Sequence, residues 1–331
     1  MTRILRNGNG RLRVPLRLVW NDDERRPRAP VRLVVGIVVV LVFANTGRTL
    51  RPSPFAGDGP LAAVANTLVG GIPQSGGIAL GVVLVALVVD RRVLTDLGLR
   101  FGRGVWRRFA GGLVLGLGIT SLGIAVGVAV GFYEFAGVTL TGGPGVWTVL
   151  VVGTALSQLF VVVAEELFVR GYIITNAVEG LDGLPSIPRG VAVGVAVAIS
   201  SAFFYFTHST RGDAFAVMAG GLAVFLGIAY VLSGDLAVPI GLHFGVNFAA
   251  MIGGSAPQQA TLVRLSSSAT VAESLLLPPE AVVVRLLGAA VGVGLLVGWY
   301  RRARGDGPVA RSIVHPTLRG DRGTEPPTES T

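Results

Sequence analysis

The sequence predicts an all-α, polytopic membrane protein with about eight transmembrane helices. Hydrophobic residues make up 51% of the 331 positions and charged residues only 14%, about half the charged share of a typical soluble domain. Some stretches carry no charge at all, and residues 111–130 are an example. Runs of this length reach the ~20 apolar residues that a helix needs to cross the hydrocarbon core of a bilayer.

Eight apolar runs lead to the predicted number of spans. They occupy residues 31–45, 76–89, 109–132, 146–178, 190–208, 213–232, 236–254 and 281–299. The second run is short, and we expect residues 60–75, which include Pro60 and Pro73, to add a partial turn before it. The domain prediction is a basic tail at 1–30, a transmembrane helical domain at 31–300 and a disordered tail, rich in Gly, Pro, Thr and Ser, at 301–331.

The charges predict the orientation of the chain. All 28 basic residues are arginine, and most lie in the N-terminal segment, in the 90–108 connector and in the C-terminal tail. Because basic residues concentrate on the cytoplasmic side, an even number of spans with both termini in the cytoplasm is expected. The arginines flank apolar runs, which favours a lipid bilayer over nucleic acid as the partner. The all-arginine composition fits a prokaryotic plasma membrane.

Ionisable side chains inside apolar spans indicate where a functional site lies, because each costs several kcal/mol in lipid. Arg285 lies near a helix end and is expected to extend to the interface. The remaining candidates, with one amide beside them, are Glu165, Glu166, Arg170, His208, His243 and Asn247. The chain has no cysteine, which excludes disulfides, thiolate catalysis and cysteine-based metal sites.

The two adjacent glutamates are predicted to differ. Glu166 and Arg170 are four residues apart, a spacing that places them on one helix face as an ion pair. Glu165 points about 100° away and has no local partner. A carboxylate without a charged partner is a candidate general base. The alternative is a buried polar cluster that only holds helices together.

The histidines extend this candidate site. His243 and Asn247 share one helix face, and both can donate hydrogen bonds, as an oxyanion site requires. At ~1.5 Å per residue, Glu165 and His208 are expected at about 22 and 27 Å above the same interhelical turn, close enough in depth to meet. His243 fits less well, since it lies only about 10 Å beyond the start of its own span.

Three short motifs on successive spans resemble one family. They are Glu165-Glu166-x-x-x-Arg170, Phe204-x-x-x-His208 and His243-x-x-x-Asn247. In this order they resemble the CPBP family, which comprises the CAAX prenyl protease 2 (Rce1-type) enzymes and their bacterial Abi relatives. The resemblance covers about 90–250 and includes Asp96-Leu97-Gly98-Leu99 followed by Trp106.

The resemblance implies an intramembrane glutamate protease that acts on a membrane protein or a lipidated peptide. The implied roles are water activation by Glu165 and His208, oxyanion stabilisation by His243 and Asn247, positioning of Glu165 by Glu166 and Arg170, and packing by Phe204 one turn from His208. Neither the substrate nor the oligomeric state is encoded in these motifs.

Other functions stay open beside this prediction. The chain lacks the His-Glu-x-x-His motif of zincins and a Gly-x-Ser-Gly elbow, and no cofactor is expected. A divalent metal such as zinc remains an alternative, with Glu165, His208, His243 and Asn247 as ligands. The alternatives to catalysis are a membrane scaffold, a bacteriocin-immunity type of protein and a proton-coupled transporter.

Overall fold

The computed structural model describes residues 19–50, 52–57, 59–102, 104–254, 260–266, 279–304, 309–310 and 313. Its helices are α2 (Ala29–Thr49), α3 (Pro60–Val88), α4 (Val105–Ala129), α5 (Gly143–Glu166), α6 (Thr175–Asp182), α7 (Arg189–His208), α8 (Asp213–Ser233), α9 (Ala237–Ile252) and α10 (Pro279–Arg304). A π-helix, η2 (Leu167–Ile174), joins α5 to α6, and two short 3₁₀ turns are η1 (Leu94–Leu97) and η3 (Ser209–Arg211).

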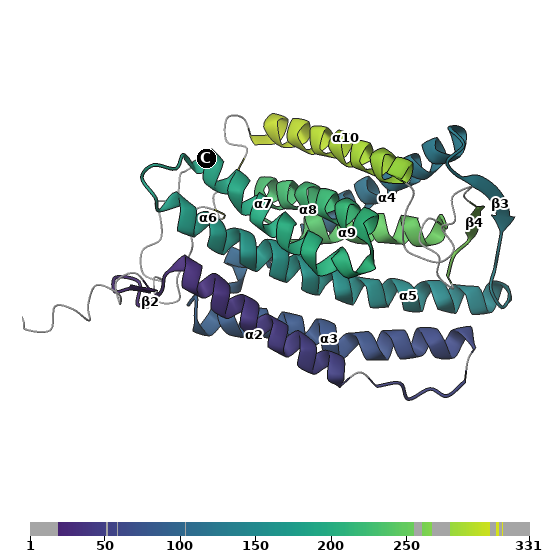
Figure 1. Cartoon of the computed structure of the whole chain (residues 1–331), viewed down its shortest axis with the longest axis horizontal. Helices are drawn as coiled ribbons and strands as arrows, with labels where there is room; N and C mark the ends of the chain where they lie inside the picture. The colour runs from purple at the N-terminus through teal and green to yellow at the C-terminus, as the bar shows by residue number, and fades with distance from the viewer. Residues whose placement is uncertain are drawn as a thin grey trace, which may run out of the picture.

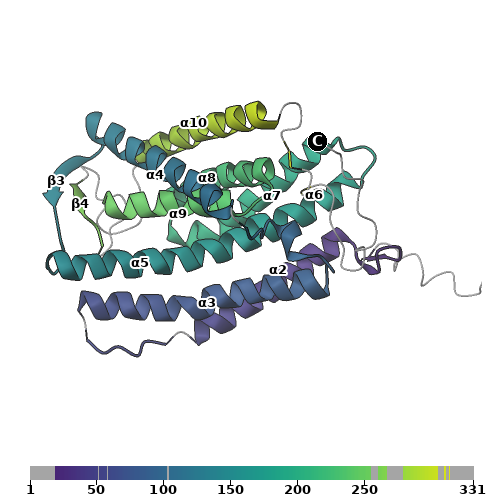
Figure 2. The ribbon, with the colours of Figure 1, turned by 180° about the vertical axis from the view of Figure 1, so that it is seen from behind.

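The long helices run side by side in layers. α2 and α3 lie along one side, α10 lies along the opposite side, and α5 passes between them (Figures 1 and 2). A hairpin of β1 (Trp20–Asn21) and β2 (Arg26–Pro27) lies at the end that carries α6. An antiparallel ribbon of β3 (Glu134–Val138) and β4 (Val263–Ser266) lies at the other end. We refer to these as the α6 end and the ribbon end.

The predicted all-α polytopic membrane fold is confirmed. Six helical segments in the described part of the chain are long and apolar enough to cross a membrane: 29–49, 60–88, 105–129, 143–182, 189–211 and 213–233. α9 is also apolar but has only 16 residues. Each of the eight apolar runs falls on a helix.

The expected partial turn at 60–75 is wrong, because α3 is one continuous helix of 29 residues. Pro60 occupies the first turn, where a missing backbone N–H costs nothing. Pro73 lies inside the helix, a position that neighbouring helices make tolerable in membrane proteins. The neighbouring helix here is α2, which packs against Pro73 at Gly47. The approach is so close that a Cβ atom at Gly47 would meet the Pro73 carbonyl oxygen.

Four glycines bring α4 and α9 into backbone contact. Gly112 and Gly116 lie on α4, and Gly241 and Gly245 lie on α9. A Cβ atom at any of the four would meet a backbone carbonyl oxygen of the other helix. Such close approach between small residues drives helix association where no hydrophobic effect operates between helices. The short helix α9 is thereby fixed against a full-length neighbour.

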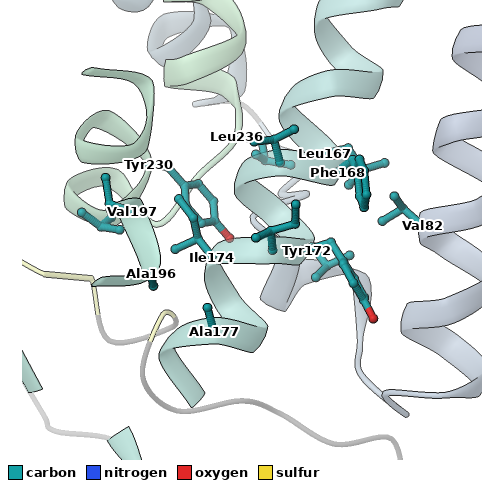
Figure 3. Close-up of a cluster of buried hydrophobic side chains, with 14 of the residues drawn as sticks. Val82, Leu167, Phe168, Tyr172, Ile174, Ala177, Ala196, Val197, Tyr230 and Leu236 are labelled. Atoms are coloured by element: carbon teal, nitrogen blue, oxygen red, sulfur yellow. The ribbon is translucent and has the colours of Figure 1, made fainter. Parts of the chain in front are cut away.

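The main apolar core surrounds the π-helix. All eight residues of η2 are buried, and they pack with side chains of α3, α6, α7 and α8. Figure 3 shows Val82, Tyr172, Ala196 and Tyr230 among these side chains. The segment that directly follows Glu166 is therefore held on all sides by protein and not by lipid.

A cluster of buried arginines, which we call the arginine anchor, ties the N-terminal segment to α6. Arg26 Nη2 lies 2.7 Å and Arg32 Nη2 lies 2.6 Å from Glu179 Oε1. Arg92 pairs with the other oxygen of this carboxylate, Oε2. The three arginines are at most 1% exposed. The anchor joins the β1–β2 hairpin, α2, the connector after α3 and α6.

Two findings concern the C-terminal part of the chain. Arg285, which is expected to extend to the interface, places Nη1 2.7 Å from Met218 Sδ of α8. Within the stretch predicted as a C-terminal tail, the Ala310 N–H donates to Val231 O, and Ile313 is buried against the main core. Most of that stretch lies outside the described residues, as do residues 1–18, so the predicted domain boundaries stay predictions.

Candidate active site

Glu166 lies at the centre of the polar group that the sequence singles out. Its side chain is completely buried, and Arg170 Nη1 donates to its Oε1 at 3.0 Å, as the spacing of the two residues predicts. His243 Nδ1 lies 2.8 Å from the same oxygen. Glu166 thus joins the end of α5 and the π-helix to α9.

The contact with Glu166 fixes the proton on His243. A carboxylate that pairs with Arg170 is ionised and only accepts hydrogen bonds, so His243 Nδ1 carries a proton. In the neutral ring Nε2 is then the unprotonated nitrogen. It lies 4.0 Å from Glu165 Oε2, which is too long for a direct hydrogen bond but within the span of one bridging water.

Arg170 is held by two further groups. Its Nη2 donates to the carbonyl oxygen of Ala223 in α8 at 3.4 Å. Its guanidinium carbon lies 4.8 Å from the centre of the Phe204 ring, a cation–π distance. Phe204 is only 3% exposed. The charge that balances Glu166 is therefore fixed by α7 and α8 as well as by its own helix.

Glu165 has different surroundings from its neighbour. Its side chain is 24% exposed, whereas that of Glu166 is inaccessible. Within the described residues, Glu165 forms no ion pair at hydrogen-bond distance, and its contact with His243 is the 4.0 Å approach. The predicted Glu166–Arg170 pair is therefore present, and the Glu165 carboxylate makes no ion-pair contact as short as that one among the described residues.

His208 ends α7 and lies beside Phe204. Its ring centre is 4.2 Å from that of Phe204, and the Phe204 ring is in turn 5.9 Å from His243. Nδ1 of His208 is 2.8 Å from the Phe204 carbonyl oxygen. Since a carbonyl only accepts, this Nδ1 carries the proton and Nε2 is left as an acceptor. The Phe204 ring thus lies beside both histidine rings.

Asn247 contacts a residue that the sequence analysis did not single out. Its Nδ2 donates to Gln158 Oε1 of α5 at 3.4 Å. Gln158 is uncharged, so a search limited to ionisable groups passes over it. The sequence does contain one indication of its role. Gln158 lies seven residues before Glu165, which places the two residues two turns apart on the same face of α5.

The depth of His243 follows from a buried turn between α8 and α9. The Leu236 N–H donates to Gly98 O at 3.0 Å, and Leu236 is 1% exposed. Gly171, six residues after Glu165, packs against Leu236. The turn thus lies inside the protein at the level of Gly171, and His243 rises about 10 Å from it along α9. Because the turn is buried at a point six residues along the chain from Glu165, the rise of α9 brings His243 to the level of Glu165.

The chain continues from Glu166 into the π-helix, where the sequence predicts an ordinary helix over 146–178. π-helical turns occur mostly as short segments within α-helices, often at functional sites. Ser200 of α7 donates to Val169 O at 2.9 Å, and Thr175 donates to Gly171 O at 2.5 Å. Hydroxyl groups thus satisfy carbonyls of the irregular segment.

A metal-ligand set is not formed by the described side chains. No three His, Asp or Glu residues in this part of the chain group in a way that could hold a metal ion. His243 uses Nδ1 for Glu166, and His208 uses Nδ1 for a backbone carbonyl. Each imidazole therefore keeps Nε2 outside these contacts, and Nε2 of His243 lies 4.0 Å from Glu165 Oε2.

Comparison with protein families supports the predicted resemblance. Residues 147–249 match the family model described as type II CAAX prenyl endopeptidase Rce1-like. All seven site residues inferred from the motifs lie in this segment. No curated protein and no solved structure matches the chain. Between residues 147 and 249 the chain therefore carries an Rce1-like domain of the CAAX protease family.

Proposed function

We propose that the protein is an intramembrane endopeptidase that hydrolyses a peptide bond of a membrane protein or lipidated peptide. The observation that carries the proposal is the approach of the Glu165 carboxylate to the His243 imidazole inside a helical membrane domain. Its carboxylate is partly accessible, has no ion pair at hydrogen-bond distance among the described residues and lies 4.0 Å from His243 Nε2. An Rce1-like segment encloses all of these groups.

Water activation is assigned to Glu165 and His208. The carboxylate of Glu165 accepts a proton from a water as the water oxygen attacks the peptide carbonyl carbon. His208 Nε2, left as an acceptor by the Phe204 contact, orients the same water. Glu165 then passes the proton to the leaving amine as the C–N bond breaks, which returns the carboxylate to its starting form.

Oxyanion stabilisation is assigned to Asn247 and His243. Asn247 has two N–H donors on Nδ2, of which one is used by Gln158, so the other is available for the oxyanion. His243 donates through Nε2 only when both of its ring nitrogens carry a proton. Its contact with the Glu166 carboxylate places a negative charge beside this imidazolium form.

The test compares wild type with Glu165→Gln, purified and incubated with membrane peptides or a tagged proteome. Wild type is expected to give defined cleavage products that Glu165→Gln does not give, because an amide cannot accept the proton. Glu134→Gln, in the exposed strand β3, is the matched control and should cleave like wild type. Identical products from wild type and Glu165→Gln, or none from either, would leave a scaffold or a proton-coupled carrier as the function.

Metal dependence is tested separately on the same preparations. We propose a metal-free reaction, in which the Glu165 carboxylate and not a metal ion activates the water. Activity is expected to persist after treatment with a chelator, and metal analysis should find no stoichiometric zinc. Zinc that is lost together with activity would instead establish the metal-dependent alternative.

A further inference from the structure

Two side-chain amides face each other where α5 contacts α9. Asn247 Nδ2 donates to Gln158 Oε1 at 3.4 Å, and both side chains are partly buried. Toward the ribbon end, the same two helices meet through apolar residues, among them Leu150 and Met251. A polar pair in this position needs an explanation, because an amide moved into apolar surroundings costs free energy unless it is hydrogen-bonded.

The Gln158–Asn247 pair lies on the same two helices as Glu165 and His243, toward the ribbon end. Gln158 precedes Glu165 by two helical turns, and Asn247 follows His243 by one turn. α5 and α9 run in opposite directions in this region, since Glu166 meets His243 and Gln158 meets Asn247. The two contacts are therefore successive links between the same pair of helices, and the second contains the proposed oxyanion donor.

We infer that Gln158 is a positioning residue, which orients the Asn247 amide so that one Nδ2 hydrogen points to Gln158 and the other to the oxyanion. The orientation matters because an amide turned by 180° would present Oδ1, an acceptor, to the developing negative charge. The inference rests on the proposed function and adds to it the residue that determines which end of Asn247 faces the substrate.

The expected effect is on the rate of the chemical step. Loss of a direct oxyanion donor lowers kcat by roughly 10²–10³, and a residue that orients such a donor contributes less. Gln158→Met keeps an unbranched side chain of similar length and removes the acceptor. We expect kcat to fall about tenfold with KM within about twofold, because the donor acts on the transition state and not on the bound substrate.

A double-mutant cycle separates positioning from a direct or purely structural role. The substrate is a fluorogenic peptide that contains a cleavage site mapped with wild type in the proteome experiment. Asn247→Ala and Asn247→Ala/Gln158→Met are expected to have the same kcat, because Gln158 acts only through Asn247. A further tenfold loss in the double variant would overturn the inference, as would a wild-type kcat for Gln158→Met alone.

Two controls complete the experiment. Ser157→Ala removes the neighbouring polar side chain, which faces Gly71 of α3, and should leave kcat unchanged. Thermal melting in detergent should place Gln158→Met within a few degrees of wild type, and a large loss of stability with equal kcat per folded molecule would refute positioning. If Glu165→Gln cleaves normally, the proposed function fails and this inference with it. If Glu165→Gln is inactive and Gln158→Met is unimpaired, only the inference fails.

Discussion

Glu165 and Glu166 are consecutive residues with opposite electrostatic surroundings. Glu166 is enclosed and touches Arg170 and His243 through one oxygen, so its charge is balanced by fixed partners. Glu165 is partly accessible and meets His243 only at 4.0 Å. We infer that the first carboxylate of the pair is available for proton transfer and the second maintains the geometry.

This difference predicts opposite effects of two equivalent substitutions on stability. Glu166→Gln should destabilise the fold by about 3–5 kcal/mol, since it leaves the buried Arg170 charge without a counter-charge. Glu165→Gln should change stability little, because no ion pair is lost. Thermal unfolding of both variants in the same detergent measures the effect. Equal melting temperatures for the two variants would contradict the assignment of a structural role to Glu166.

At the residue scale, contacts within one helix could be predicted and contacts between helices could not. The Glu166–Arg170 pair follows from a spacing of four residues, and it is present. The contact between His243 and Glu166 depends on the depth of the α8–α9 turn, which no local pattern encodes. Gln158 was missed because an uncharged amide in an apolar run gives only a weak signal.

At the element scale, the position of α9 depends on its backbone contact with α4. His243 and Asn247 lie on this 16-residue helix. Their polar contacts join one face of α9 to α5, and another face of α9 packs against α4. The glycines Gly241 and Gly245 bring it against α4 without intervening side chains. We infer that this contact sets the distance between the proposed oxyanion donors and Glu165.

The contact predicts that two nearby glycines of α4 respond differently to the same substitution. Gly116→Leu should lower the melting temperature and the catalytic activity, because the new side chain would collide with the α9 backbone. Gly118→Leu is the matched control, since a Cβ atom there meets nothing within 4 Å. Thermal melting and peptide cleavage are the measurements. Similar behaviour of the two variants would mean that the close approach of α4 and α9 is not required.

The positions of the helices were predicted better than their internal geometry. The apolar runs locate the long helices of the described residues, because the length of an apolar run is a direct consequence of membrane thickness. The proline rule failed at Pro73, where close packing by α2 outweighs the local preference. The π-helix η2 was not predicted, because its wider turns depend on buried packing partners and not on a local sequence signal.

At the scale of the whole molecule, the arginine distribution predicts orientation. We propose that the α6 end faces the cytoplasm, because the arginine-rich connector between α3 and α4 lies at that end. The chain has no cysteine, so a single introduced cysteine reports on one position. Thr95→Cys, in the connector, and Ser53→Cys, between α2 and α3, are both exposed positions at opposite ends.

Labelling of these two variants in intact cells tests the orientation. An impermeant maleimide should modify Ser53→Cys directly and Thr95→Cys only after the membrane is permeabilised. The unaltered chain serves as the control, since it offers no thiol for the reagent. The reverse labelling pattern would place the α6 end outside the cell and would show that the arginine bias does not determine the topology of this protein.

The arginine anchor has a consequence for the order in which the nascent chain assembles. Arg32 is synthesised 147 residues before Glu179, the carboxylate with which it pairs. Until that residue emerges, the arginine at the beginning of α2 keeps its charge in water by extending toward the headgroups. The ion pair with Glu179 forms only once α6 is in place, so we expect α2 to take its final position after the glutamate-bearing helix has been synthesised. We therefore expect the final placement of α2 and the docking of α6 against it to be coupled steps of biogenesis.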